Sequence, residues 1–399
     1  MCKQFIKNLT NKEKILVLLI PSFYLFLAAL RTTIMSPEHY EYQFFWDHHK
    51  YIYMAENPFQ YHLAPYCWRI LNPLIVYLLP FGTTNDFFIL TSLTLFFSSL
   101  MVYYLLRILK FETEYAITGL IIFLGMGWII KYNIYDFWLT DSLLNVFILL
   151  LYLSLIRKKD VALSLLLATG VLVKETVLFI APLYYTFNTE KLVSPKLILK
   201  NVFLVLPALS VFLVVRLAIP GLNGNPAYIG SLPPELQNIT YNTNSYDIVE
   251  FVLSFHIQYP LYKMVAIVIS AYGIIPLLFS VLGIKKNIKI FYIYFPIIII
   301  SLLQLFYAVN LPRLLAISFW PILLMGVNGI KYISTKYNIS VYWFIFTAVT
   351  IPIINLLSKY TIMIQGRIQL FIIVSAMLLF TFHKLYKRVS IESNISRQV

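Results

Sequence analysis

The chain has 399 residues, of which 60% are hydrophobic and only 12% are charged, a composition that excludes an ordinary soluble domain of this length. Its formal net charge of +14 would suit a nucleic-acid-binding protein. However, the Lys and Arg residues stand at the ends of apolar runs and form no dense patch, so we expect no nucleic-acid partner. The apolar runs are continuous and do not alternate. They therefore predict an all-α polytopic membrane protein, because backbone polar groups in lipid must be satisfied within helices.

The apolar runs predict about twelve transmembrane helices, within a range of 10–13, because a bilayer core about 30 Å thick needs roughly 20 apolar residues per crossing. The first run follows Lys12 and Lys14, and no small-residue cleavage site comes after it, so we interpret it as a retained span. All spans belong to a single transmembrane domain over residues 1–399. They are expected near residues 15–34, 87–106, 115–131, 139–156, 161–174, 176–187, 199–219, 262–283, 290–309, 312–330, 340–357 and 369–386.

The segment 161–187 has two interpretations. One long helix would cross the membrane once, whereas two short helices would enter and return, with a turn at Lys174–Glu175. With the turn, 21 of the 31 Lys and Arg residues lie on the cytoplasmic side, and without it this bias disappears. The positive-inside rule therefore favours the turn, and it places both termini in the cytoplasm of a multi-pass plasma-membrane protein.

Two long loops are predicted on the outer side, at residues 35–86 and 220–262. Each contains a short amphipathic segment, 66–79 in the first and 246–255 in the second, which we expect to lie along the outer interface as a helix. Because so little of the chain lies outside the membrane, any chemistry must use these loops and the ends of the helices.

The first outer loop carries three kinds of candidate side chain. Asp47 follows the first span among aromatic residues, where it would act as a general base toward a hydroxyl or cap a short helix. His48 and His49 point apart, so even with His62 they make a weak metal site, and His48 is kept as a substrate-binding candidate. Arg69 would bind a phosphate through two hydrogen bonds or would anchor the chain at headgroup depth.

Charged residues also stand at three places beside apolar runs. The turn Y-D-F-W-L-T-D carries Asp136 and Asp141, and acids at such a depth tend to be functional, although a solvated turn with Asp141 as a helix cap is the alternative. Lys174 and Glu175 at the tip of the hairpin must be sheltered by protein or water, unless they merely form an ion pair that marks the turn. Arg313 begins a late span, as an anchor or as a partner for a lipid phosphate.

Five features occur in order along the chain. They are the Asp47 loop after the first span, R-I-L-N-P-L from Arg69, Y-D-F-W-L-T-D, the V-K-E-T hairpin, and P-R-L-L before a late span. This order resembles the GT-C glycosyltransferases, membrane enzymes that use a polyprenyl-phosphate-linked sugar as donor. The resemblance covers roughly the first half of the chain well and the second half thinly. Some members carry two nearby acids in the first loop, where this chain has D-H-H.

The resemblance implies an inverting transfer on the outer face, to a glycan, lipid or protein acceptor. Asp47 would remove a proton from the acceptor hydroxyl, and Asp136 and Asp141 are the next catalytic candidates. No cofactor is implied with certainty, and a divalent metal stays an open alternative. The residues expected to bind the donor lipid or the acceptor are Arg69, Lys174, Glu175, Arg313 and His48.

Two other classes of function stay open. An outer-face polysaccharide polymerase would depend on Arg residues of the outer loops and would tolerate the loss of Asp47. A twelve-span transporter would place ionisable residues near the middle of the membrane, at helix breaks in both halves. In this sequence such residues gather toward one face, which counts against transport.

Overall fold

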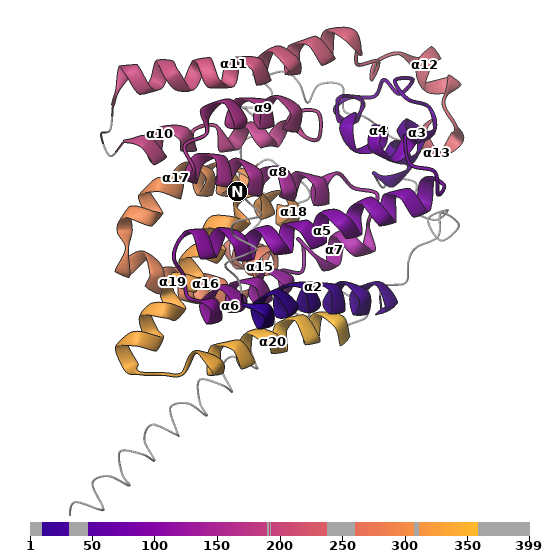
Figure 1. Cartoon of the computed structure of the whole chain (residues 1–399). Coiled ribbons are helices and arrows are strands. Elements are labelled where there is room, and N and C mark those ends of the chain that lie inside the picture. The colour runs from indigo at the N-terminus through magenta and orange to yellow at the C-terminus, as the bar shows by residue number, and fades with distance from the viewer. Residues whose placement is uncertain are drawn as a thin grey trace, which may run out of the picture.

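The computed structural model of the chain describes residues 10–31, 47–189, 191, 193–237, 260–306 and 311–357, and every regular element in these ranges is a helix (Figure 1). The elements up to residue 188 are α2 (Asn11–Arg31), α3 (His48–Glu56), η2 (Tyr66–Trp68), α4 (Leu71–Tyr77), α5 (Thr83–Ile108), α6 (Thr113–Leu124), α7 (Lys131–Tyr135), α8 (Asp141–Ile156), α9 (Asp160–Gly170), η3 (Glu175–Ile180) and α10 (Leu183–Asn188). The later elements are α11 (Pro195–Ala218), α12 (Pro226–Ser231), α13 (Pro234–Gln237), α15 (Leu261–Tyr272), α16 (Ile274–Lys286), α17 (Ile288–Leu303), η5 (Gln304–Phe306), α18 (Leu311–Leu315), η6 (Ala316–Ser318), α19 (Phe319–Tyr337) and α20 (Val341–Leu357).

Within the described ranges, four helices are long and apolar enough to cross a membrane: Asn11–Leu30, Thr83–Ile108, Pro195–Ala218 and Arg313–Tyr337. The pair α15 and α16 would make a fifth crossing, bent by 94° at Gly273, whose φ of +83° suits a residue without a side chain. Shorter apolar helices stand in other predicted spans, at Thr113–Leu124, Asp141–Ile156, Asp160–Gly170, Ile288–Leu303 and Val341–Thr350. These helices fit a membrane protein with several passes, whereas the figure of about twelve spans stays a prediction.

Some predicted elements differ from the structure or lie outside it. The predicted span at 115–131 is shorter, because α6 ends at Leu124 and a turn follows. The predicted interfacial helix at 66–79 is divided into η2 and α4, with a break at Arg69–Ile70. The predicted span at 369–386 and the predicted helix at 246–255 lie outside the described residues.

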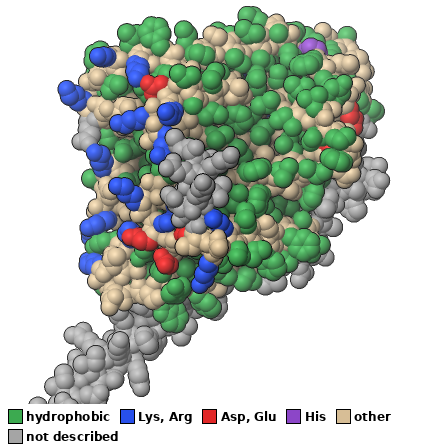
Figure 2. Space-filling model, viewed as in Figure 1, with side chains coloured by type: hydrophobic (Ala, Val, Ile, Leu, Met, Phe, Trp, Pro, Cys, Tyr) green, Lys and Arg blue, Asp and Glu red, His purple; other side chains and the backbone are tan. Residues whose placement is uncertain are grey.

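Helix α11 shows the kind of surface that the bundle exposes. Ser194 precedes the helix and Pro195 occupies its first turn, where a missing N–H costs nothing. Most of its apolar side chains face outward, and Leu217 is 83% exposed. Apolar side chains cover much of the face seen in Figure 2. Such a surface would be unfavourable in water and suits a lipid environment.

The Lys and Arg side chains gather along one edge of the same view (Figure 2), at the end of the bundle where α10 lies and α11 begins (Figure 1). The short helices α3, α4, α12 and α13 lie at the other end. We call the first of these the basic end. Exposed basic side chains of its helix ends and loops include Lys158, Lys159, Lys191, Lys196, Lys200, Lys285, Lys286 and Lys289.

The segment from α9 to α10 reverses direction, in agreement with the two-helix interpretation of residues 161–187. Helix α9 ends at Gly170, and after a turn the chain continues as the 3-10 helix η3. Helix α9 packs against α11, while α10 packs against α17 and also contacts α11. In Figure 1, α10 lies at the basic end, beside the start of α11. Lys174 and Glu175 therefore stand at the return point inside the bundle.

Described parts of the two predicted outer loops, residues 47–79 and 219–237, pack together at the other end, and we call them the cap. Asn223 joins them through its side chain, accepting from Ala64 N at 2.7 Å and donating to Ala64 O at 3.0 Å. Trp68 Nε1 donates to Ile219 O at 2.9 Å. A hydrophobic cluster separate from the main core fills the cap, and it includes the fully buried Trp138 from the turn before α8. These contacts hold the described part of the first outer loop in a fixed place.

The closest helix packing in the described bundle involves α16 and α19. A Cβ atom added to Gly329 would lie 1.9 Å from Phe279 O, and one added to Gly283 would lie 2.1 Å from Met325 O. Both positions therefore require glycine, which lets the two backbones meet in the way that small residues allow in membrane helices. Helix α19 continues from η6, so this contact also fixes the segment that carries Arg313.

Candidate functional site

Asp47 stands immediately before α3, and three side chains hold its carboxylate. Lys50 Nζ donates to Oδ1 at 2.9 Å, the Tyr66 hydroxyl donates to Oδ1 at 2.6 Å, and Arg313 Nη1 donates to Oδ2 at 3.2 Å. The side chain makes no capping hydrogen bond to α3, so the capping alternative does not describe its contacts. Burial alone would raise the pKa of Asp47, but the charges of Arg313 and Lys50 outweigh burial and lower this pKa well below its usual range.

Asp141 connects the hairpin tip to the late helix. It is the first residue of α8, and its Oδ1 accepts from Lys174 Nζ at 2.7 Å. Its Oδ2 lies 2.7 Å from Arg313 Nε in a second ion pair. Arg313 therefore lies between two acids, Asp47 from the first loop and Asp141 from α8, although 266 residues separate it from Asp47 in the sequence.

Arg69 and Glu175 form a third pairing, between the cap and the hairpin tip. Arg69 Nη2 donates to Glu175 Oε1 at 2.5 Å and Nε donates to Oε2 at 3.1 Å, while Nη1 donates to the Tyr51 hydroxyl at 3.4 Å. The backbone supports the same junction, because Leu71 N donates to Leu172 O at 2.9 Å. Such a two-bond arrangement fixes the orientation of the guanidinium as well as its position.

Asp136 is the fourth acid, and its surroundings differ from those of the other three. It follows α7 and is buried. The Tyr132 hydroxyl donates to Oδ2 at 3.4 Å, and Oδ1 has no hydrogen-bond partner among the described residues. Burial raises the pKa of Asp136 to about 7, against the opposing charge of Arg313 and with the help of nearby Asp47.

These side chains make one charged network with an equal number of acids and cations. When every group is ionised the charges cancel, and protonation of Asp136 leaves one net positive charge. The acids of the network are Asp47, Asp136, Asp141 and Glu175, and its cations are Lys50, Arg69, Lys174 and Arg313.

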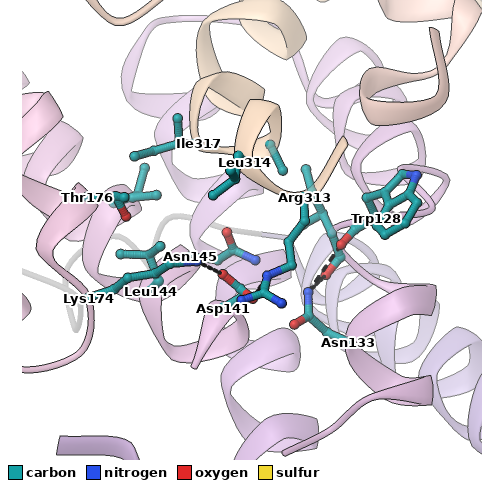
Figure 3. A pocket seen from close by; sticks show the side chains of 13 residues that line it. Trp128, Asn133, Asp141, Leu144, Asn145, Lys174, Thr176, Arg313, Leu314 and Ile317 are labelled. Atoms are coloured by element: carbon teal, nitrogen blue, oxygen red, sulfur yellow. Dashed lines mark hydrogen bonds and ion pairs between the residues drawn. The ribbon is translucent and has the colours of Figure 1, made fainter. Parts of the chain in front are cut away.

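A pocket opens at this network, beside the Asp141–Arg313 pair (Figure 3). Its cavity volume is about 20 Å³, enough for about one water molecule. Lys174, Asp141 and Arg313 supply its charged side chains. Helix α8 and the segment from α18 to η6 supply an apolar side through Leu144, Ile148, Leu314 and Ile317. The pocket thus combines charged and apolar side chains, and a ligand larger than a water molecule would have to separate its walls.

The structure brings seven of the predicted site residues together and leaves one apart. The seven are Asp47, Arg69, Asp136, Asp141, Lys174, Glu175 and Arg313. His48 is fully buried in the cap, with its ring centroid 3.9 Å from that of His49 and 6.5 Å from that of Trp138. Burial lowers the pKa of His48 to about 3. His48 thus has a place in the packing of the cap and does not line the pocket.

The structure offers no clear metal site in the ranges it describes, since no three His, Cys, Asp or Glu side chains there are grouped in a way that could hold an ion. His62 lies in the cap, with Nδ1 3.3 Å from Pro220 O. The acids Asp47, Asp141 and Glu175 each face a cation instead. These contacts suit recognition of an anion better than coordination of a metal.

Sequence reasoning missed several participants. Lys50 stands three residues after Asp47, a spacing that brings side chains together on a helix, so it could have been found. Asn145 stands four residues after Asp141 on the same face of α8, which is a similar signal. Tyr66 carried no signal, because tyrosine is abundant throughout the chain.

No protein-family model matches the chain, and no curated protein matches it.

Proposed function

We propose that the protein is a membrane glycosyltransferase that moves a hexosyl or pentosyl group from a polyprenyl-phosphate-linked donor to an acceptor hydroxyl. The observation that carries the proposal is the convergence of Lys174 and Arg313 on one pocket that also has an apolar wall. Two cations suit a phosphate, and the apolar wall suits the first units of a lipid chain. The order of sequence features that resembles GT-C enzymes adds independent support.

The proposal includes an orientation. The basic end would face the cytoplasm, in accord with the positive-inside rule, with about twelve spans and both termini on that side of the plasma membrane. The cap and the pocket would then open toward the outer leaflet, where a lipid-linked donor lies. The gathering of Lys and Arg along one edge of the bundle (Figure 2) supports this orientation.

In the proposed reaction, Lys174 and Arg313 hold the phosphate of the donor. A carboxylate takes the proton of the acceptor hydroxyl, and the oxygen attacks the anomeric carbon while the bond from that carbon to the phosphate oxygen breaks. The electron pair of that bond leaves with polyprenyl phosphate, and the configuration inverts. A phosphate is already a stable anion, so the leaving group needs no second carboxylic acid, unlike that of a glycosidase. Positioning and charge stabilisation supply most of the acceleration.

Two acids compete for the role of proton acceptor. The sequence favours Asp47, but three donors hold its carboxylate, and a carboxylate with such a low pKa is a weak base. Asp136 has a pKa of about 7 and an oxygen without a partner among the described residues, and an effective base has a pKa close to the working pH. Neither carboxylate lines the pocket itself. We propose Asp136 as the proton acceptor because it is the stronger base, and Asp47 as a positioning residue that orients Arg313.

The test is sugar transfer from polyprenyl-phosphate-linked donors, in membranes that contain equal amounts of each variant. Asp136→Asn should lower the rate by about 10²–10⁴-fold, the range typical of a general base. Asp47→Asn should change the KM for the donor more than kcat, because it releases Arg313. Glu56→Gln, which changes an exposed acid at the end of α3, is the matched control and should keep full activity.

The outcomes separate the parts of the proposal. An active Asp136→Asn together with an inactive Asp47→Asn would return the role of base to Asp47. If the wild type transferred no hexose or pentose from any polyprenyl-phosphate donor, the proposed function itself would be wrong.

One observation favours a transporter as the second candidate. One helix break lies in the pocket wall, at Lys174, and another lies behind the wall, at the 94° bend between α15 and α16. The bent pair contacts the pocket wall, because Ser270 accepts from Trp128 Nε1 at 2.8 Å. Transporters place such breaks at their binding sites. Uptake of radiolabelled inorganic phosphate by proteoliposomes, abolished in Lys174→Met, would favour transport over transfer.

A further inference from the structure

A third part of the pocket wall is polar but uncharged. Asn133, Asn145 and Thr176 line it, from α7, α8 and η3 respectively (Figure 3). Asn133 and Asn145 are only 2% and 5% exposed. The amide nitrogen of Asn133 donates to Trp128 O and Ile129 O, which leaves its Oδ1 without a partner among the described residues. Thr176 Oγ1 is likewise buried without a partner there.

Unpaired polar atoms of this kind are unfavourable inside a protein. A buried donor or acceptor without a partner costs about 1–3 kcal/mol. Elsewhere in the bundle, similar side chains bond to their own helix: Thr118 donates to Glu114 O at 2.7 Å, and Ser154 donates to Leu150 O at 2.9 Å. Thr176 follows the turn after Gly170, at the start of η3, and makes no such bond.

The position of these atoms indicates what would satisfy them. Other buried polar atoms also lack partners among the described residues, but Asn133 and Thr176 share one pocket with Asn145, Lys174 and Arg313. Amide and hydroxyl groups both donate and accept hydrogen bonds, so they match neutral hydroxyl groups, which do the same. A carboxylate can only accept hydrogen bonds and an ammonium group can only donate them. Ordered water can occupy such positions and be displaced by ligand hydroxyls that reproduce its bonds.

We infer that Asn133, Asn145 and Thr176 form a subsite for a neutral, hydroxyl-bearing ring, adjacent to the anion site of Lys174 and Arg313. The inference rests on the proposed function and deepens it, because it assigns the sugar of the donor to this wall. Because the cavity has room for about one water molecule, its walls separate on binding. The phosphate then lies on the two cations, the sugar hydroxyls on the amides and the threonine, and the start of the lipid chain on the apolar side. The subsite determines which sugar is accepted.

The experiment measures the binding of two probes to purified full-length protein: polyprenyl phosphate, and the same carrier with a hexose attached. The variants are Asn145→Leu and Thr176→Val, which keep the volume and remove the polar atoms. Asn133 is left unchanged because its nitrogen also holds the turn before α7. Ser154→Ala, in α8 with its hydroxyl bonded to its own helix, is the control.

Each subsite variant should weaken binding of the hexose carrier about tenfold, equivalent to about 1.4 kcal/mol, and should change binding of polyprenyl phosphate less than twofold. Retained binding of polyprenyl phosphate also shows that the variant is folded. A series of carriers can be made in which the hexose lacks one hydroxyl at a time. The carrier that lacks the hydroxyl bound by Thr176 should bind equally well to the wild type and to Thr176→Val.

Two results would overturn the inference while leaving the proposed function standing. One is a wild type that binds both probes and variants that bind the hexose carrier as well as the wild type does. The other is an equal loss for both probes. A wild type that binds neither probe would instead show that the proposed function is wrong, and the subsite would fall with it.

Discussion

The junction between the cap and the hairpin should depend on the Arg69–Glu175 pair to a degree that a double-mutant cycle can measure. The two side chains share two hydrogen bonds, at 2.5 and 3.1 Å, and are 9% and 30% exposed. Removing one partner of a buried pair costs about 3–5 kcal/mol. The partial exposure of Glu175 favours the lower end, so Arg69→Met and Glu175→Gln should each lower the free energy of unfolding by about 3 kcal/mol.

The double variant leaves no unpaired charge, so it should be less destabilised than the sum of the two single variants. The coupling energy between the two sites should be about 1–3 kcal/mol. Unfolding of purified protein in mixed micelles, followed by tryptophan fluorescence against increasing dodecyl sulfate, gives the four free energies. Lys331 and Glu112 form an exposed pair at 2.7 Å elsewhere in the bundle, so Lys331→Met and Glu112→Gln should show a coupling of at most about 1 kcal/mol. A coupling at Arg69–Glu175 no larger than that of the control would refute the reasoning.

Three further predictions concern other parts of the molecule. Because the pKa of Asp136 is raised to about 7 by burial, the stability that this group contributes is complete below its unfolded pKa and is lost as the pH rises to about 7. Between pH 4 and pH 8, the free energy of unfolding of the wild type should therefore fall by about 4 kcal/mol more than that of Asp136→Asn in the same unfolding assay. Gly329→Ala should unfold at a clearly lower temperature than the wild type, because its Cβ would meet Phe279 O, whereas Gly230→Ala, with nothing within 4 Å, should not. Reporter fusions should all report the cytoplasm at residues 110, 158, 193, 287 and 334, and an outer location at 193 would contradict the hairpin.

The sequence predicted the helices and the sites of charge better than it predicted the contacts. Charge bias alone identified the return at Lys174–Glu175, because orientation in a membrane depends on where basic residues lie. The partners of Arg313 could not be predicted, since Asp47 and Asp141 are distant in the sequence and only tertiary packing brings them to it. The apolar pattern likewise gave no sign that three donors hold Asp47.

The predicted interfacial helix at 66–79 failed for a local reason. Pro73 has no N–H, so a helix running through it would lose the hydrogen bond to the carbonyl of Arg69. The structure instead begins α4 at Leu71, which places Pro73 in the first turn, where no such bond is needed. The break leaves Arg69 in a non-helical conformation, from which its side chain reaches Glu175. Pro73 thus contributes to the position from which the Arg69 side chain reaches Glu175.

The carboxylate of Asp141 lies between the two cations that we assign to the phosphate. It acts as an internal competitor that is always present at the site. An incoming phosphate must displace it, so part of the binding energy is spent on separating Asp141 from Lys174 and Arg313. Under the proposed function, the same competition would work in the other direction after transfer, when Asp141 would reoccupy the cations as polyprenyl phosphate departs. Such reversible occupation would favour turnover, because tight retention of the spent carrier would limit the rate.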